Sequence, residues 1–296
     1  MKKFINSFFI ISAGILLIII LFEFKYKSYE TSYDYIYNNL NKQKNQINVI
    51  YIGNSHTGVL KNVPIKSQDI VSNLSSQGQD LFKIYVIIKK YIPLLPQLKR
   101  IYIGLDYEML GQNQTISGEE FIERQLYKYT DTLYHYDIAN ILMSQSNFFR
   151  ANRDLTFLLK KNNKNESKEK ANTFIPISSK KTNLKECQKR ALEHSLIKFK
   201  KDLCSQNLSY IVELIKLCKI NNVSLIFFNP PKRKCFCDNI IYDNSMSAKK
   251  QIDSIMLNNN MLYYDFVGDT SFIDADFRDY DHLNADGVKK MLTKLN

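Results

Sequence analysis

Apolar and polar residues alternate along this chain in segments whose spacing predicts strands and helices in turn. Short apolar runs rich in β-branched residues, typical of buried parallel strands, lie at 47–53, 100–107, 223–229 and 262–266, with a weaker one at 70–74. Amphipathic helical patterns occupy 80–92, 205–220 and 248–257, and a last one follows Asn284. Strands that alternate with helices predict βαβ units, so we expect an α/β fold of three layers around a mainly parallel sheet.

A long helical segment interrupts this alternation. Residues 108–201 carry mainly helical patterns, broken by a Lys/Asn/Ser-rich stretch at 160–182 that has no strand periodicity. We interpret the segment as a helical insertion or lid, which carries no strand of the predicted sheet.

Most of the positive charge lies in the same segment. The chain has 41 Lys plus Arg and 29 Asp plus Glu, a net charge of +12, and residues 160–201 contain 13 of the basic residues and only 4 Glu. A nucleic-acid groove would be expected to combine such charge with aromatic residues, but the run KKNNKNESKEK has none. The pattern favours a solvated loop over a binding surface for an anion, and we expect no nucleic-acid partner.

The first residues of the chain form an apolar segment. Residues 4–22 contain no charge and, as a helix, would span about 28 Å at 1.5 Å per residue, close to the thickness of a bilayer core. A cleaved signal peptide is the alternative, but bulky residues stand after Phe22 where a cleavage site needs small ones. We therefore expect a cytoplasmic tip and signal-anchor helix over 1–27, a stalk over 28–46, and an α/β domain over 47–296 outside the cytoplasmic membrane.

The five cysteines indicate neither a disulfide framework nor a metal site. Their number is odd, so they cannot all pair within the chain. Cys235 and Cys237 are close in sequence, but no second pair of Cys or His stands at ligand spacing. We expect buried or loop thiols with at most one disulfide, and no bound metal.

Residues that can carry chemistry follow the predicted strands. In an open parallel sheet, ligands bind beyond the carboxyl ends of the strands. The polar segments at these ends and before the last helix are Gly53–Thr57, Ser76–Gln79, Gly104–Tyr107 and Asp279–Asn284. They bring Ser, His and Asp to one edge of the sheet.

Three of these residues can form a nucleophilic set. A serine hydroxyl needs a base to take its proton, and the base needs an acceptor that fixes its tautomer. Ser55, His282 and Asp279 can take these roles, because one tight turn brings Asp279 back to an imidazole three residues later. Asp281 is the alternative partner of His282. Backbone N–H groups at Ser55 and Gly78 would stabilise an oxyanion if their loops converge.

This arrangement resembles the SGNH (GDSL-like) hydrolase and acyltransferase superfamily. Residues 53–57 (GNSHT) look like its first block with Ser55 as nucleophile, Gly78 matches the oxyanion glycine of its second block, and residues 279–282 (DYDH) are similar to its terminal D-x-x-H. The resemblance covers roughly residues 47–107 and 223–296. It implies a flavodoxin-like domain and a Ser55–His282–Asp279 triad.

The sequence departs from that pattern at two positions. Asn54 replaces the Asp of the GDSL block, a variation that membrane-anchored branches of the superfamily share. Asp106 stands where the third block supplies an Asn to the oxyanion hole, and an ionised carboxylate cannot donate a hydrogen bond. Either Gln79 or another group donates instead, or Asp106 binds substrate hydroxyls, or the hole is weak. Asn54 and His56, on either side of the nucleophile, are candidate contacts of the substrate or oxyanion.

Each of these residues also has a purely structural interpretation. Ser55 could cap a helix after its strand, and His282 could be a structural histidine before a helix that Asn284 caps. Only their joint occurrence favours catalysis. His135 and His194 fall within helical patterns of the insertion, where we expect surface residues.

The resemblance and the apolar N-terminus together imply a function at the cell envelope. Membrane-anchored proteins of this kind move acyl groups onto envelope polysaccharides, commonly with a multi-span membrane acyltransferase as donor partner. We expect transfer of an acyl group, taken to be acetyl, through an acyl-Ser55 intermediate to a polysaccharide hydroxyl. A carbohydrate esterase or deacetylase would use the same triad with water as acceptor, and a non-catalytic glycan-binding or assembly scaffold is the third hypothesis, supported by Asp106. No nucleotide-binding pattern is present, so we expect no cofactor.

Overall fold

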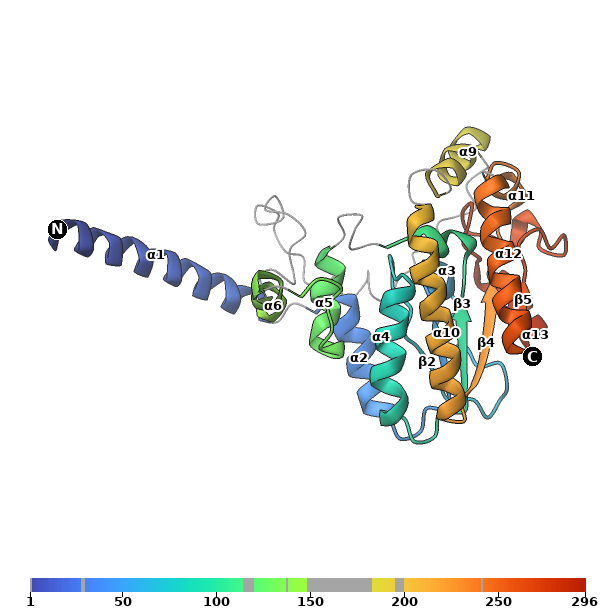
Figure 1. The fold of residues 1–296 in the computed structure, drawn as a ribbon, viewed down its shortest axis with the longest axis horizontal. Helices are drawn as coiled ribbons and strands as arrows, with labels where there is room; N and C mark the ends of the chain where they lie inside the picture. The colour runs from blue at the N-terminus through green and yellow to red at the C-terminus, as the bar shows by residue number, and fades with distance from the viewer. Residues whose placement is uncertain are drawn as a thin grey trace. The chain divides into compact units, whose positions relative to one another are not determined.

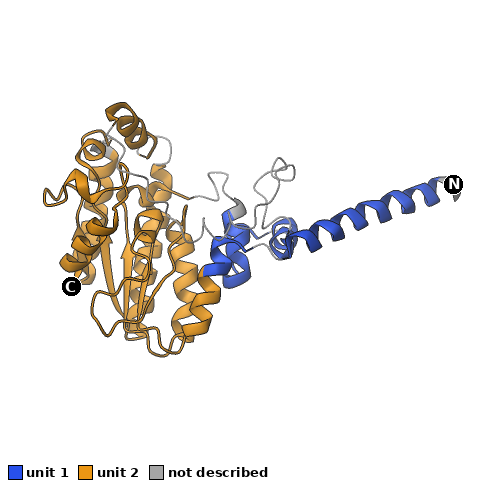
Figure 2. Cartoon of the chain, turned by 180° about the vertical axis from the view of Figure 1, so that it is seen from behind, with its two compact units in different colours: residues 1–35, 121–172 blue, residues 36–120, 173–296 orange. Residues whose placement is uncertain are grey.

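The structure is a computed structural model of the 296-residue chain. It describes residues 2–27, 30–113, 120–136, 138–147, 183–194, 200–240 and 242–296. These residues divide into two compact units, one of residues 1–35 and 121–172 and the other of residues 36–120 and 173–296 (Figure 2). The Lys/Asn/Ser-rich stretch at 160–182 lies outside the described residues.

The first unit is helical. It contains α1 (Lys2–Tyr26), α5 (Glu120–Thr130) and α6 (Ile138–Gln145). Within α1 the span Phe4–Tyr26 is 23 residues long, has a mean hydropathy of 2.6 and is not buried by the rest of the chain. The helix is therefore long and apolar enough to cross a membrane, a property that a signal sequence shares.

The second unit is built around a five-stranded parallel sheet (Figure 1). The strands are β1 (Val49–Ile52), β2 (Val71–Asn73), β3 (Arg100–Gly104), β4 (Ser224–Asn229) and β5 (Leu262–Asp265). Their order is β2-β1-β3-β4-β5, with Val49 paired to Val71 and to Arg100. This is the flavodoxin-like strand order, and the predicted α/β fold with a mainly parallel sheet is confirmed.

Helices cover both faces of this sheet. The longer ones are α2 (Ser32–Gln43), α4 (Leu81–Tyr91), α9 (Leu184–Leu192), α10 (Cys204–Ile220), α12 (Tyr242–Asn259) and α13 (Ala285–Leu295). The short ones are α3 (Ser55–Gly58), α11 (Lys234–Cys237) and the 3-10 turns η1 (Ile92–Leu94), η2 (Tyr107–Gly111), η5 (Lys201–Leu203) and η6 (Asp274–Asp276). Helices α4 and α10 pack together in front of the sheet in the view of Figure 1.

The sheet core follows from the alternation of side chains along each strand. Tyr51, Tyr102 and Phe228 point to one face, where they join a buried cluster with Met291 and Leu292 of α13. The alternate residues of the same strands are also buried, which is the pattern of a parallel sheet covered on both faces. Burial on both faces explains why the apolar runs of the sequence are not interrupted by polar residues.

Helix boundaries follow the capping residues. Asp80 accepts a hydrogen bond from the backbone N–H of Lys83 at 3.0 Å and starts α4, and Asn284 accepts from the N–H groups of Asp286 and Gly287 to start α13. The predicted helices over 80–92, 205–220 and after 284 are thus confirmed within one or two residues, whereas α12 begins six residues before the predicted 248.

The segment expected to be a stalk contains a folded helix. Residues 28–46 include α2, whose Tyr37 and Leu40 are buried. The ring of Tyr37 stacks on that of Tyr91 in α4, with 5.0 Å between the ring centroids. Residues 36–43 therefore belong to the compact second unit.

Candidate active site

The nucleophile candidate lies where β1 passes into α3. Asn54 starts this short helix by accepting a hydrogen bond from the backbone N–H of His56 at 2.9 Å. The helix approaches the ends of β1 and β3 closely, because a Cβ atom at Gly53 or Gly104 would lie only 2.3 or 1.8 Å from Oγ1 of Thr57. The two glycines therefore allow α3, and with it Ser55, to lie directly on the edge of the sheet.

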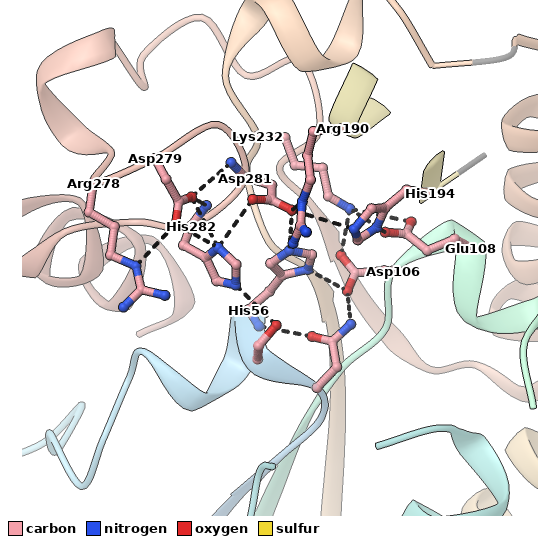
Figure 3. Close-up of polar contacts among 12 residues, drawn as sticks. His56, Asp106, Glu108, Arg190, His194, Lys232, Arg278, Asp279, Asp281 and His282 are labelled. Atoms are coloured by element: carbon pink, nitrogen blue, oxygen red, sulfur yellow. Dashed lines mark hydrogen bonds and ion pairs between the residues drawn. The ribbon is translucent and has the colours of Figure 1, made fainter. Parts of the chain in front are cut away.

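Ser55, His282 and Asp279 form a chain of hydrogen-bonding contacts. Nε2 of His282 is 3.0 Å from Oγ of Ser55, and Nδ1 of the same ring is 3.0 Å from both carboxylate oxygens of Asp279 (Figure 3). These are the contacts that a serine nucleophile, its general base and the orienting carboxylate require. The structure brings together the three residues predicted from the sequence.

The loop before α13 sets the imidazole in place. One carboxylate oxygen of Asp279 accepts hydrogen bonds from the backbone N–H groups of Asp281 and His282, at 3.1 and 2.8 Å. This tight turn returns the carboxylate to the ring three residues later. Burial opposes ionisation of Asp279, but the hydrogen bond from His282 outweighs it and lowers the pKa of that carboxyl.

Asp281 also lies near the catalytic imidazole, but most of its contacts go elsewhere. Its Oδ1 is 3.1 Å from Nδ1 of His282, while its Oδ2 lies 3.2 Å from Nε2 of His56 and accepts from Nε of Arg190 at 3.0 Å. Burial opposes its charge, yet His282 and His56 lower its pKa well below the usual value. Asp281 therefore connects the triad to a second group of charged residues.

That second group is a buried network centred on Asp106. Its Oδ2 lies 2.8 Å from Nδ1 of His56 and accepts a hydrogen bond from Nδ2 of Asn54, and its Oδ1 accepts from Nζ of Lys232 at 2.8 Å. Lys232 also donates to Glu108 at 3.1 Å. Asp106 has no exposed surface, and His56 and Lys232 are each only a few per cent exposed.

The charged side chains of the network lie against partners of opposite charge, and this pairing shifts their pKa values. Burial disfavours the charged form of His56, but Asp106 and the hydrogen bonds to Asp106 and Asp281 outweigh it and raise the pKa of His56 to about 9. Burial likewise disfavours the charge of Lys232, and its two carboxylate partners raise its pKa. Burial raises and Lys232 lowers the pKa of Glu108, which falls to about 2. The raised pKa favours the imidazolium form of His56, whose ring lies 4.6 Å from that of His282.

Helix α9 brings part of the helical insertion to this network. Arg190 contacts Asp281, and Nδ1 of His194 lies 3.2 Å from Oε1 of Glu108. A disulfide between Cys187 of α9 and Cys235 of α11 fixes the helix, with 6.2 Å between their Cα atoms. One disulfide was the most that the sequence predicted, and the expectation that Cys235 binds no metal agrees with its pairing.

Two groups of side chains in the network lie close enough to ligate a metal ion. They are His56 with Asp281 and His282, and His56 with Asp106 and Glu108. In both groups protein cations already occupy the carboxylates, Arg190 on Asp281 and Lys232 on Asp106 and Glu108. A metal ion would have to displace these cations, so the arrangement fits internal ion pairing better than metal binding.

Three residues expected to bind substrate or an oxyanion are committed to the network instead. Asp106 was a possible ligand for substrate hydroxyls, but it is buried and both its oxygens are occupied. Both ring nitrogens of His56 face carboxylates, and the side chain of Asn54 bonds to Asp106 and to the N–H of His56. Their proximity to the nucleophile is as predicted, whereas direct contact with substrate is not supported.

The second predicted loop lies beside the first. The N–H of Ser76 donates to the carbonyl of Gly53 at 3.4 Å, which ties the loop after β2 to the end of β1. Gly78 has a φ of +70°, a conformation that glycine adopts without strain. The side chain of Gln79 is 2% exposed, and its amide has no hydrogen-bond partner among the described residues. Gln79 is therefore a buried donor that remains unused.

Several residues of the site were not predicted from the sequence, or were predicted to lie elsewhere. Lys232 and Glu108 follow β4 and β3 at the same edge, so the rule that located Ser55 could also have located them. No feature of the sequence marked Arg190 as a site residue, since it lies in a basic segment typical of solvated loops. His194 was expected on the surface, but it is 9% exposed because Glu108 and Phe236 pack against its ring. His135 is exposed, as expected.

Comparisons with known proteins give similarity to solved structures only. No protein-family model matches the sequence, and no curated protein matches it. A candidate acylhydrolase from Bacteroides fragilis is similar over 87% of this chain and 92% of its own, with 12% identity and a TM-score of 0.43. A GDSL-like lipase from Bacteroides thetaiotaomicron is similar over 88% of this chain and 95% of its own, with 10% identity and a TM-score of 0.42. The function is therefore argued from the geometry of the site.

Proposed function

We propose that this chain is a serine-dependent acyl-ester enzyme that transfers an acyl group, such as acetyl, to a hydroxyl of a cell-envelope polysaccharide. The observation that carries the proposal is the pair of 3.0 Å contacts that link Ser55 to His282 and His282 to Asp279. The carboxylate fixes the ring with its proton on Nδ1, which leaves Nε2 free to accept the proton of the serine hydroxyl.

The reaction begins with attack on the donor ester. Oγ of Ser55 attacks the acyl carbonyl while its proton passes to Nε2 of His282, and the protonated ring then donates that proton to the leaving oxygen. The N–H of Ser55 has no acceptor within α3, because Ser55 is the first residue of that helix. Together with the N–H of Gly78 it can stabilise the oxyanion, and the buried amide of Gln79 is the candidate third donor.

The second half returns the enzyme to its starting state. His282 takes the proton of an acceptor hydroxyl, the resulting nucleophile attacks the acyl-serine carbonyl, and the proton moves to Oγ of Ser55 as the acyl group leaves. A sugar hydroxyl as acceptor gives transfer, and water gives hydrolysis. Arg190 of helix α9 and His194, just after that helix, contact the charged residues beside the triad, which supports a covered site and hence transfer.

Location outside the cytoplasm is part of the proposal. Helix α1 has the length of a membrane anchor, and a disulfide such as Cys187–Cys235 is typical of oxidising compartments outside the cytoplasm. A multi-span membrane acyltransferase that supplies the acyl group would be a suitable partner, because acyl donors are made inside the cell.

The first test separates catalysis from binding. Purified full-length protein in detergent should hydrolyse p-nitrophenyl acetate and react with a fluorophosphonate probe, and Ser55→Ala should lose both activities by at least 10³-fold, roughly the contribution of such a nucleophile. Thr57, whose hydroxyl is buried two residues away, gives a matched control in Thr57→Val, which should retain labelling. Equal labelling of Ser55→Ala and wild type would contradict the proposal.

The second test identifies the acceptor. The O-acyl content of envelope polysaccharide is measured by proton NMR in a deletion strain carrying wild type or Ser55→Ala. Loss of esters that wild type restores and Ser55→Ala does not would support transfer. A gain of esters in the deletion strain would support an esterase, and no change would favour the non-catalytic scaffold or another substrate.

A further inference from the structure

Helix α6 has an apolar face that no part of the described chain covers. Ile138 and Leu142, four residues apart and so on one side of the helix, are 77% and 65% exposed. Tyr136, just before the helix, is 61% exposed. We call these three residues the α6 face. Single exposed apolar residues are common, but two on one helical turn beside an exposed Tyr are contiguous, and contiguous apolar surface marks candidate interaction sites.

The opposite side of α6 is fixed by polar contacts. Nε and Nη2 of Arg124 in α5 donate to Oδ1 of Asn140 at 3.2 and 3.1 Å. The orientation of α6 about its own axis is therefore set by α5. The α6 face is held outward.

The carboxyl end of α6 is attached to the end of α1. Glu23 accepts a hydrogen bond from the backbone N–H of Asn147 at 2.8 Å and another from Oγ of Ser146. Glu23 is the first charged residue after the uncharged run 4–22, so it marks the level at which α1 would leave the hydrocarbon core. These contacts lie within the first unit, and they place α6 at that boundary.

The composition of the helix fits the same boundary. The sequence is uncharged from 138 to 149, so no charge would enter the apolar layer with the α6 face. Tyr136 at the edge suits the headgroup region, where Tyr is enriched.

We propose that the α6 face inserts into the lipid interface next to α1, as a second and shallow membrane contact. An interfacial helix of this kind buries its apolar side at the boundary between headgroups and acyl chains, about 5–10 Å deep. Two attachments hold the first unit in a fixed orientation on the bilayer, which a single spanning helix does not. The inference needs α1 in the membrane and does not depend on the proposed acyl chemistry.

The absence of Trp from the chain allows a direct test. Single-Trp variants Leu142→Trp, Leu17→Trp and Leu257→Trp of the full-length protein are reconstituted into phosphatidylcholine vesicles with and without bromine on the acyl chains. Leu17 lies within α1 and serves as the deep reference, and Leu257 on α12 is 82% exposed and serves as the aqueous control. Retained fluorophosphonate labelling or an unchanged circular dichroism spectrum confirms that each variant is folded.

We expect at least twofold quenching and blue-shifted emission for Leu142→Trp, stronger quenching for Leu17→Trp, and none for Leu257→Trp. Quenching of Leu17→Trp alone would overturn the inference and leave α1 as the only membrane contact. Absence of quenching at both Leu17→Trp and Leu142→Trp would also overturn it, because α1 would then not lie in the bilayer. None of these results bears on Ser55.

Discussion

At the scale of single residues, two aspartates lie within hydrogen-bonding distance of Nδ1 of His282, and their other contacts distinguish their roles. Asp279 directs both oxygens to the ring, so Asp279→Asn should favour the wrong tautomer and lower kcat about 10⁴-fold. Asp281 also holds His56 and Arg190, so Asp281→Asn should lower the free energy of unfolding by about 3 kcal/mol. Esterase kinetics and urea unfolding of both variants measure these effects. Loss of activity only in Asp281→Asn, with unchanged stability, would reverse the two assignments.

His56 predicts a dependence of stability on pH. Its pKa in the folded protein is about 9, because Asp106 and Asp281 outweigh burial and the nearby charge of Lys232. In an unfolded chain a histidine titrates near about 6.5. The raised pKa means that its stabilisation is complete below about pH 6.5 and is lost as the pH rises through about 9.

The variant His56→Gln isolates this contribution. Urea unfolding of both proteins in detergent, from pH 6 to pH 10, should show the wild type losing on the order of 3 kcal/mol relative to His56→Gln, since one pKa unit corresponds to about 1.4 kcal/mol. Parallel stability curves for the two proteins would show that His56 is not held as an imidazolium.

At the scale of elements, the position of α3 depends on Gly104 at the end of β3. A Cβ atom there would lie 1.8 Å from Oγ1 and 3.1 Å from Cβ of Thr57, so Gly104→Ala should displace α3 and lower stability by about 1–3 kcal/mol. Ester hydrolysis should fall as well, because Ser55 begins that helix. Adding Thr57→Ala should recover at least part of the stability, and a double-mutant cycle without coupling between the two sites would contradict this explanation.

The disulfide determines how firmly α9 is held against the charged network. Its cysteines are 48 residues apart, a separation for which the entropy of the unfolded chain gives about 4 kcal/mol of stabilisation. Cys187→Ser with Cys235→Ser should lower the free energy of unfolding toward that amount. The lysines of α9 are already exposed, so a less firmly held α9 should be cut faster by trypsin after them. Cys237→Ser, a control at a free thiol, should change neither measurement.

The elements show which features the sequence could predict. Apolar runs located all five strands because both faces of a parallel sheet are buried, and the strand-end rule located Ser55 for the same topological reason. His282 was located by its place before the last helix, with Asp279 three residues earlier. The partners of Asp106 were not accessible to that reasoning. Lys232 is 126 residues away in sequence, and its charge looks like that of any surface lysine until the loops are placed. The position of Arg190 depends on the disulfide that holds α9. The periodicity of apolar residues does not predict which cysteines pair.

At the scale of the whole molecule, the candidate membrane contacts and the candidate active site lie in different units of the chain. Every residue of the triad and of the charged network belongs to the second unit, whereas the apolar helix α1 and the α6 face belong to the first. Changes in α1 should therefore alter where the protein resides without altering the contacts of Ser55. The intact mass of the membrane-bound chain should include residues 1–27, and a mature chain that lacks them would identify α1 as a cleaved signal sequence.

Charge in the middle of α1 should release the protein from the membrane. Ile11 and Ile15 lie near the centre of the uncharged run, where each lysine costs about 2.5–3.5 kcal/mol, so Ile11→Lys with Ile15→Lys should shift the chain from the carbonate-resistant pellet to the soluble fraction. Phe24→Lys places a single charge beyond the run, where a lysine can reach the headgroups, and should leave the protein in the pellet, as Ile11→Lys alone should not. Equal retention of both variants would mean that α1 does not span the bilayer. Fluorophosphonate labelling of Ser55 in both fractions shows whether the second unit remains folded, which separates a failed anchor from a misfolded protein.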